Sequence, residues 1–333
     1  MFSARSPVRL TVPVKDPFDW HLTMTYPSRA YAHPIYRAEG DRLHRVVWLG
    51  RRPWRLTLGP ARRHGKDWRL AVEGYPLRGE APGAGAGAGN DGAAGGGADA
   101  DSGAVAQALQ DAVAQIVSAD HDLAAMADAV AGDPVMARLV QRFQGLRILR
   151  MPSVFEGLAD AIVGQQISVP AAHKIRLRLM TEFFPRAAAE PDFLPDPLPF
   201  PHPAAVAGAD LDDLIRCGLI GRRAEYLAGV ARLAVDGELP GDDLKNASLH
   251  AAVKRLTAIR GVGPWTAELT LLFSVGRTDI CPAGDLGLQD AVARAYGLDR
   301  RPAEQEVREM AAAWAGWESY AAYYLWGTRR WNG

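Results

Sequence analysis

Cysteine is scarce in this sequence, since Cys217 and Cys281 are the only two among 333 residues. Two distant cysteines exclude a disulfide scaffold, a cysteine-rich zinc module and a four-cysteine iron–sulfur cluster. They favour a reducing, cytoplasmic compartment. Charge of one sign is lacking as well, because 38 Lys and Arg balance 38 Asp and Glu. This balance excludes a uniformly basic chain that coats nucleic acid or membrane.

Long apolar runs are also missing. No run approaches the roughly 18 residues that a membrane helix needs, and Arg5, Pro7 and Arg9 interrupt the start of the chain, where a signal peptide needs an apolar stretch. We therefore expect a cytoplasmic chain without a membrane partner. A hydrophobic fraction of 48% is enough for a sizeable core, and the length predicts about two domains.

The pattern changes once along the chain. Residues 45–49 and 54–58 mix β-branched, aromatic and Arg residues in short runs, which is typical of antiparallel strands. From Ala81 to Gly103, 17 of 23 residues are Gly or Ala, and we interpret this stretch as a flexible insertion. Apolar residues then recur at helical spacing to the end. The sequence predicts an α+β fold, with an N-terminal antiparallel-sheet domain at 1–145 and an all-helical body at 146–333.

Residues 256–268 have the pattern of two helices joined by a tight turn. Gly261 and Gly263 permit close approach and unusual backbone angles, and Pro264 suits the first position of the second helix. Such a turn directs backbone N–H groups and the positive end of a helix outward, which favours an anion or phosphate. An ordinary interhelical turn would use the same glycines, so this motif alone leaves both interpretations open.

Asp285 lies 22 residues after Gly263, in a loop that leads into another helix. Its position predicts an N-cap, and capping alone would explain the residue. A carboxylate at a helix N-terminus can also stabilise a cationic transition state. The two roles are compatible.

Two further segments could contact nucleic acid. Gln165 and Gln166 follow an amphipathic helix, and their amides carry both donors and acceptors that suit base edges or a gap in a base stack, although plain turn polarity explains them equally well. The C-terminal region is rich in aromatic residues, most of which we expect in the core, with one or two available to stack on a nucleobase. They are Trp314, Trp317, Tyr320, Tyr323, Tyr324, Trp326 and Trp331.

Together these motifs resemble the helix-hairpin-helix DNA glycosylase superfamily, and within it the DNA-3-methyladenine glycosylase II family of alkylation repair. The resemblance rests on residues 16–20, 161–168, 261–267 and 317–321 and on the loop with Asp285. It implies an N-terminal sheet domain and two helical subdomains that flank an active-site cleft. It also implies a monofunctional hydrolase that flips an alkylated base out of double-stranded DNA and cleaves its N-glycosidic bond.

The resemblance assigns roles to individual residues. Asp285 matches the catalytic aspartate, which would stabilise an oxocarbenium-like sugar. The base pocket would be lined by Trp265, Trp326, Tyr26 and Gln165, whose aromatic members attract a cationic base such as 3-methyladenine or 7-methylguanine. Members with lyase activity carry a Lys where this chain has Trp265, so lyase activity is not expected.

The remaining assignments concern DNA. Gln166 would fill the gap left by the flipped base, and Arg222 would contact a phosphate. Backbone groups of the turn would bind phosphate at Gly261, Val262, Gly263 and Thr266. No cofactor is required, although a structural Na⁺ or K⁺ would sit on the carbonyl oxygens of Thr257, Ile259 and Val262.

Two alternatives stay open from the sequence. A glycosylase of the same superfamily could act on deaminated or oxidised bases instead. A non-catalytic module could use the hairpin for phosphate contacts, but Asp285 argues against it, because a carboxylate near DNA weakens plain binding. A cleft of this kind needs only a monomer.

Overall fold

The computed structural model describes residues 6–30, 33–77, 80–81, 100–184 and 196–328. Most of the predicted insertion therefore lies outside the described residues. The prediction is wrong for the last four residues of this stretch, because helix α2 (Ala100–Ile116) already begins at Ala100. Residues 101 and 102 are Asp and Ser, which suit the start of a helix, so the amphipathic helix that follows extends back into this stretch.

A five-stranded antiparallel sheet forms the N-terminal part, in the order β1-β5-β4-β3-β2, and the strands predicted at 45–49 and 54–58 are confirmed. Leucine and valine side chains on one face of β4 and β5 are fully buried, as the period of two along a strand requires. The strands are β1 (Val8–Val14), β2 (Arg37–Glu39), β3 (Arg42–Leu49), β4 (Arg52–His64) and β5 (Asp67–Pro76).

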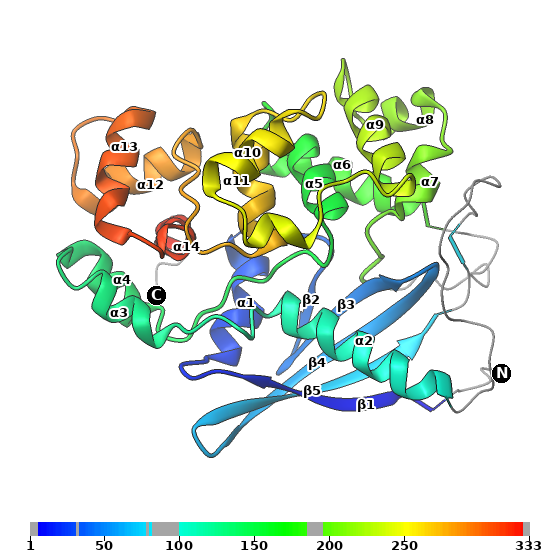
Figure 1. The fold of residues 1–333 in the computed structure, drawn as a ribbon, viewed down its shortest axis with the longest axis horizontal. Helices are drawn as coiled ribbons and strands as arrows, with labels where there is room; N and C mark the ends of the chain where they lie inside the picture. The colour runs from blue at the N-terminus through cyan, green and yellow to red at the C-terminus, as the bar shows by residue number, and fades with distance from the viewer. Residues whose placement is uncertain (1–5, 31–32, 78–79, 82–99, 185–195, 329–333) are drawn as a thin grey trace.

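Helix α2 lies across this sheet (Figure 1). Its buried Leu109, Val113 and Ile116 share a hydrophobic core with Leu56 and Val72 of the sheet. This core is separate from the larger helical one, so the sheet and α2 form a layer of their own.

The rest of the chain is helical, as predicted. The helices are α1 (Trp20–Ala30), α3 (Ala124–Ala129), α4 (Pro134–Arg142), α5 (Val154–Gly164), α6 (Val169–Glu182), α7 (Pro203–Ala207), α8 (Leu211–Arg216), α9 (Arg223–Val235), η2 (Asp242–Lys245), α10 (Leu249–Thr257), α11 (Pro264–Thr270), η3 (Leu271–Val275), α12 (Leu286–Tyr296), α13 (Glu304–Ala311), η4 (Ala312–Trp314) and α14 (Glu318–Thr328). Among the described residues, none of these helices has the length and apolar character to cross a bilayer.

The helices form two neighbouring groups (Figure 1). One contains α5 to α9, and the other contains α12 to α14 with α3 and α4; the hairpin of α10 and α11 lies between them. Although α3 and α4 precede the predicted domain boundary at 145, their side chains pack in the helical core. A hydrogen bond connects α4 to the C-terminal helices, because Asp133, the N-cap of α4, accepts from the indole of Trp314 at 3.0 Å.

Buried ion pairs join the sheet to α5. Arg45 of β3 pairs with Glu156, and His33, in the segment before β2, donates its Nε2 proton to the carboxylate of Asp160 at 2.9 Å. Arg176 of α6 also binds Asp160. Burial would raise the pKa of Asp160, but the charges of Arg176 and His33 outweigh it and hold that pKa below its ordinary range. These contacts fix α5, and with it the Gln165–Gln166 turn that follows.

Candidate active site

Asp285 is the N-cap of α12, as the sequence predicted. Its Oδ1 accepts the backbone N–H of Leu288 at 2.7 Å. Two indole N–H groups complete its environment: Trp265 donates to Oδ2 at 3.0 Å and Trp326 donates to Oδ1 at 3.1 Å. Three donors from α11, α12 and α14 therefore fix the orientation of both carboxylate oxygens, while the side chain stays partly exposed.

Trp326, which donates to Asp285, also contacts a further aromatic ring. Trp326 stacks on Phe273, with ring centroids 6.0 Å apart and an interplanar angle of 18°. Phe273 belongs to η3, a single π-helical turn that continues α11, and such turns occur often at functional sites. Phe273 was not among the residues predicted from the sequence. Its spacing of eight residues from Trp265, close to two helical turns, is a signal that could have indicated it.

Tyr26, which was predicted to line the base pocket, lies in the core of the protein. Its ring is fully buried and packs on Tyr323 at a centroid distance of 4.3 Å. Tyr323 in turn contacts Phe273 edge to face at 6.2 Å. In this structure Tyr26 therefore supports the aromatic layers from behind, and its role in base binding stays a prediction.

The predicted hairpin consists of α10 and α11. Gly261 has a φ of +88°, and a Cβ there would lie 2.1 Å from the Tyr226 ring, so both the backbone angle and the close approach require glycine. Gly263 has an ordinary φ of −90° and is the exposed N-cap of α11, with open space where a side chain would be. Pro264 begins the helix. The turn thus presents an unobstructed helix N-terminus to solvent.

Gln165 braces this hairpin. Its side-chain Nε2 donates to the carbonyl oxygen of Gly261 at 2.9 Å and to Oγ1 of Thr266 at 3.0 Å. Thr266 itself is buried. Gln165 was predicted to line the base pocket. The structure places its amide at the hairpin turn, and its contact with a base stays a prediction.

Gln166 is exposed and has a φ of +54°, in the left-handed region that few non-glycine residues adopt. The guanidinium of Arg223 lies next to this turn and donates to the carbonyl oxygen of Val163 at 3.3 Å. A second loop lies nearby, because Arg223 Nε reaches the carbonyl of Ile220 at 3.5 Å. Ile220 is 67% exposed, the highest value among the large apolar residues described, and no pattern in the sequence indicated it.

The other predicted residues lie in the hairpin itself or at the start of α9. Arg222 is exposed at the start of α9. Val262 is buried, and its N–H donates to the carbonyl oxygen of Ile259 at 3.0 Å. Thr257 ends α10. The cation at Thr257, Ile259 and Val262 stays a prediction.

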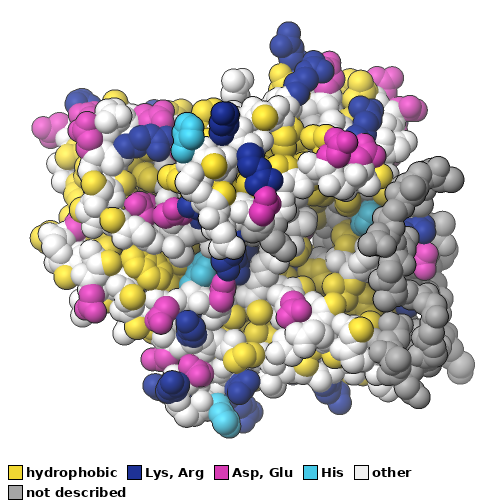
Figure 2. Space-filling view, viewed as in Figure 1, with side chains coloured by type: hydrophobic (Ala, Val, Ile, Leu, Met, Phe, Trp, Pro, Cys, Tyr) yellow, Lys and Arg dark blue, Asp and Glu magenta, His cyan; other side chains and the backbone are white. Residues whose placement is uncertain are grey.

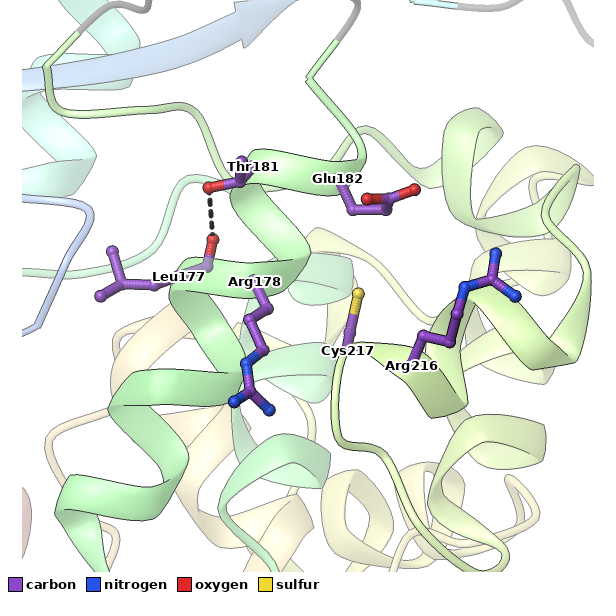
Figure 3. A pocket seen from close by; sticks show the side chains of 6 residues that line it. All are labelled: Leu177, Arg178, Thr181, Glu182, Arg216 and Cys217. Carbon is purple, nitrogen blue, oxygen red and sulfur yellow. Dashed lines mark hydrogen bonds between the residues drawn. The ribbon is translucent and has the colours of Figure 1, made fainter.

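Charge on the face shown in Figure 2 is mixed, with Lys and Arg side chains interspersed among Asp and Glu. A hollow of about 380 Å³ lies elsewhere, between α6 and α8 (Figure 3). It is lined by Leu177, Arg178, Thr181, Glu182, Arg216 and Cys217. Burial raises the pKa of the Cys217 thiol to about 11, so this hollow offers no reactive thiolate.

Comparisons with known proteins identify the family. A family model described as HhH-GPD superfamily base excision DNA repair protein matches residues 159–316. A DNA-3-methyladenine glycosylase of Bacillus subtilis is 30% identical over 207 residues, which cover 62% of this chain and 67% of that protein. The chain therefore belongs to the HhH-GPD superfamily and, within it, to the DNA-3-methyladenine glycosylase family.

Two solved structures extend the comparison. A 3-methyladenine DNA glycosylase of Archaeoglobus fulgidus shares the fold with a TM-score of 0.74 at 24% identity, covering 97% of this chain and 99% of that one. A Schizosaccharomyces pombe 3-methyladenine DNA glycosylase in complex with abasic DNA gives 0.53 at 26% identity, covering 62% and 97%. The first match includes the N-terminal sheet, so the whole described architecture recurs in a known fold.

Proposed function

We propose that the chain is a monofunctional DNA glycosylase of base excision repair, which removes alkylated bases of the 3-methyladenine and 7-methylguanine type from double-stranded DNA. The observation that carries this proposal is the carboxylate of Asp285, held on both oxygens by the indoles of Trp265 and Trp326. A partly exposed carboxylate fixed between aromatic side chains suits a reaction in which positive charge develops on a sugar beside a stacked base.

The bond that breaks joins C1′ of deoxyribose to the base nitrogen. An alkylated purine is already cationic, so it leaves with the bonding electron pair and becomes neutral without a general acid. Asp285 stabilises the oxocarbenium-like sugar and accepts a proton from the attacking water, whose oxygen forms the new bond to C1′. The target nucleotide must be flipped out of the duplex to reach this carboxylate.

The aromatic side chains select the base. A cationic ring is attracted to electron-rich indole surfaces, and Trp326 is supported from behind by Phe273. Normal bases are neutral and gain less from this contact. Selectivity for alkylated bases follows from charge as much as from shape.

The hairpin and the neighbouring loops hold the DNA. The N–H groups at Gly261, Gly263 and Thr266 bind a phosphate, with a Na⁺ or K⁺ on the nearby carbonyl oxygens, and Arg222 binds another. The predicted contact at Val262 would require its N–H to leave the carbonyl oxygen of Ile259. Gln166 enters the gap left by the flipped nucleotide. One copy of the chain carries all these groups, so we propose that a monomer acts, in the cytoplasm.

The absence of a lyase step is part of the proposal. A lyase needs an amine to form a Schiff base with the sugar, and Trp265 occupies the matching position in the hairpin helix. Strand breaks should therefore appear only after alkali treatment.

The direct test is base release from methylated duplex DNA. Wild type should release 3-methyladenine, and Asp285→Asn, which keeps the shape and the cap, should bind duplex normally and release almost none. Asp290→Asn is the matched control, because Asp290 lies on the same helix and pairs with exposed Arg301. It should behave as wild type.

Three outcomes would contradict the proposal. Wild-type release by Asp285→Asn removes the catalytic role of that residue. Release of uracil, hypoxanthine or oxidised bases without 3-methyladenine assigns another lesion. Duplex binding without release of any of these bases indicates a non-catalytic module.

A further inference from the structure

The loop that carries Asp285 is fixed by side chains from outside the loop. Gln289 of α12 is buried and donates its Nε2 to the carbonyl oxygen of Ala283 at 2.9 Å. At the start of the loop, the carbonyl oxygen of Cys281 accepts the N–H of Ala283 at 2.8 Å and a longer contact from Arg308 Nη1 at 3.4 Å. Arg308 belongs to α13, a helix without any predicted role.

Arg308 also connects this loop to the hairpin helix. Its Nη2 donates to Oε1 of Glu268 in α11 at 2.8 Å. Glu268 is three residues after Trp265, so both side chains lie on one face of α11. That face holds the loop at two points: directly through Trp265 and Asp285, and through Glu268 and Arg308 at Cys281.

Arg308 lies between two carboxylates, those of Glu268 and Glu304, and its positive charge pairs with both. Arg308 Nη2 donates to Oε1 of Glu304 at 2.7 Å. The other oxygen of Glu304 lies 3.2 Å from the position that a Cβ on Gly284 would take, directly before Asp285. Glu268 is only 7% exposed, and removing one partner of a buried ion pair leaves an uncompensated charge. Without Arg308, two carboxylates would face each other beside the loop.

We infer that Arg308 is a positioning residue that locks the loop 281–285 onto the hairpin helix, so that the Asp285 carboxylate meets C1′ of the flipped nucleotide. The inference rests on the proposed function. Arg308 touches neither DNA nor base in this role. Because α11 also begins at the phosphate-binding turn, the same ion pair links the DNA backbone contact to the orientation of the carboxylate.

The test compares Arg308→Met and Arg308→Lys with Arg300→Met. Arg300 is the matched control: it forms a bidentate pair with Glu306 of the same α13, is exposed, and does not contact the loop. Two quantities are measured on full-length protein. One is the ratio of affinities for duplex containing a cationic pyrrolidine abasic analogue and a neutral tetrahydrofuran analogue. The other is single-turnover base release per active enzyme.

A misplacement of about 1 Å can lower a rate by about 100-fold. We expect Arg308→Met to release base about 10- to 100-fold more slowly and to lose most of the preference for the cationic analogue. Affinity for the neutral analogue should stay within about twofold. Arg308→Lys should recover part of both quantities, since it restores the charge but not the fork of donors. Arg300→Met should match wild type.

The outcomes separate the two proposals. If wild type prefers the cationic analogue and releases base, but Arg308→Met keeps both per active enzyme, Arg308 has only a structural role and the inference is overturned. Equal losses of affinity for both analogues would also overturn it, because they would indicate a DNA contact. If wild type shows neither preference nor release, the proposed function fails, and the inference fails with it.

Discussion

The side-chain amide of Gln165 donates to the carbonyl oxygen of Gly261 at 2.9 Å, across 96 residues of sequence. This contact joins the turn after α5 to the turn of the hairpin. Both turns approach DNA in the proposed function, and this amide helps to hold them at a fixed spacing.

Removing that amide should therefore affect DNA binding before it affects folding. Gln165→Ala leaves Gly261 and Thr266 without their donor, and we expect a loss of about 1–2 kcal/mol in the free energy of unfolding and a clearly weaker duplex affinity. Gln305→Ala is the control, because it removes an exposed amide paired with Glu309 on α13. Unchanged duplex affinity in Gln165→Ala, measured by fluorescence anisotropy, would contradict a bracing role.

The two glycines of the hairpin should respond differently to alanine. In Gly261→Ala the alanine would have to adopt a positive φ, and its methyl group would clash with the Tyr226 ring. This substitution should lower the free energy of unfolding by about 1–3 kcal/mol or more. Gly263→Ala meets open space at a normal φ, so stability should change by less than about 1 kcal/mol. Its methyl group would still obstruct a phosphate and weaken duplex binding. Denaturant titration and anisotropy measure both effects, and equal destabilisation would refute the distinction.

Trp326 has two separable contributions. Trp326→Phe keeps a ring on Phe273 but removes the N–H that binds Asp285, whereas Trp326→Ala removes both. We expect Trp326→Phe to bind damaged duplex like wild type and to release base at least tenfold more slowly, a loss typical of one oriented donor. Trp326→Ala should also lose selectivity for cationic bases over undamaged duplex. A wild-type rate for Trp326→Phe would show that the hydrogen bond does not orient the carboxylate.

Acid should destabilise the fold through His121. Burial, helped by the charge of Arg150, lowers the pKa of His121 to about 4, against about 6.5 in an unfolded chain. Between these values the unfolded state binds a proton that the folded state does not, so stability falls as the pH drops through this window. The full difference corresponds to about 3 kcal/mol.

Urea denaturation at pH 7 and pH 4.5 measures this loss. His121→Gln should lose about 2 kcal/mol less than wild type over this interval. His64→Gln, at an exposed position of β4, should lose as much as wild type. Parallel losses in all three proteins would exclude His121 as the source.

Local patterns in the sequence predicted the features that have local causes. Asp285 caps α12, Gly261 adopts a positive φ, and Pro264 begins α11, because each of these depends on neighbours within a few residues. The strands at 45–49 and 54–58 follow for the same reason.

Features that depend on distant partners could not be predicted in this way. Nothing near Gln165 indicates that its partner is Gly261, and nothing near Arg308 indicates Glu268. Tyr26 was expected at a pocket on resemblance alone, and its burial follows from Tyr323, which lies at the other end of the chain. Similarly, the helix start at Ala100 was hidden by a composition typical of a linker.

The contact between Tyr26 and Tyr323 also bears on how the chain folds. The ring of Tyr26 packs on Tyr323, and its hydroxyl donates to the carbonyl oxygen of that residue, 297 positions later. Closing such a loop is costly in entropy, and contacts of this separation slow folding. A nascent chain on the ribosome therefore lacks the closing element of its helical core until α14 has been synthesised. The aromatic layer behind Trp326, which includes Tyr26 and Tyr323, therefore forms only after α14 has left the ribosome.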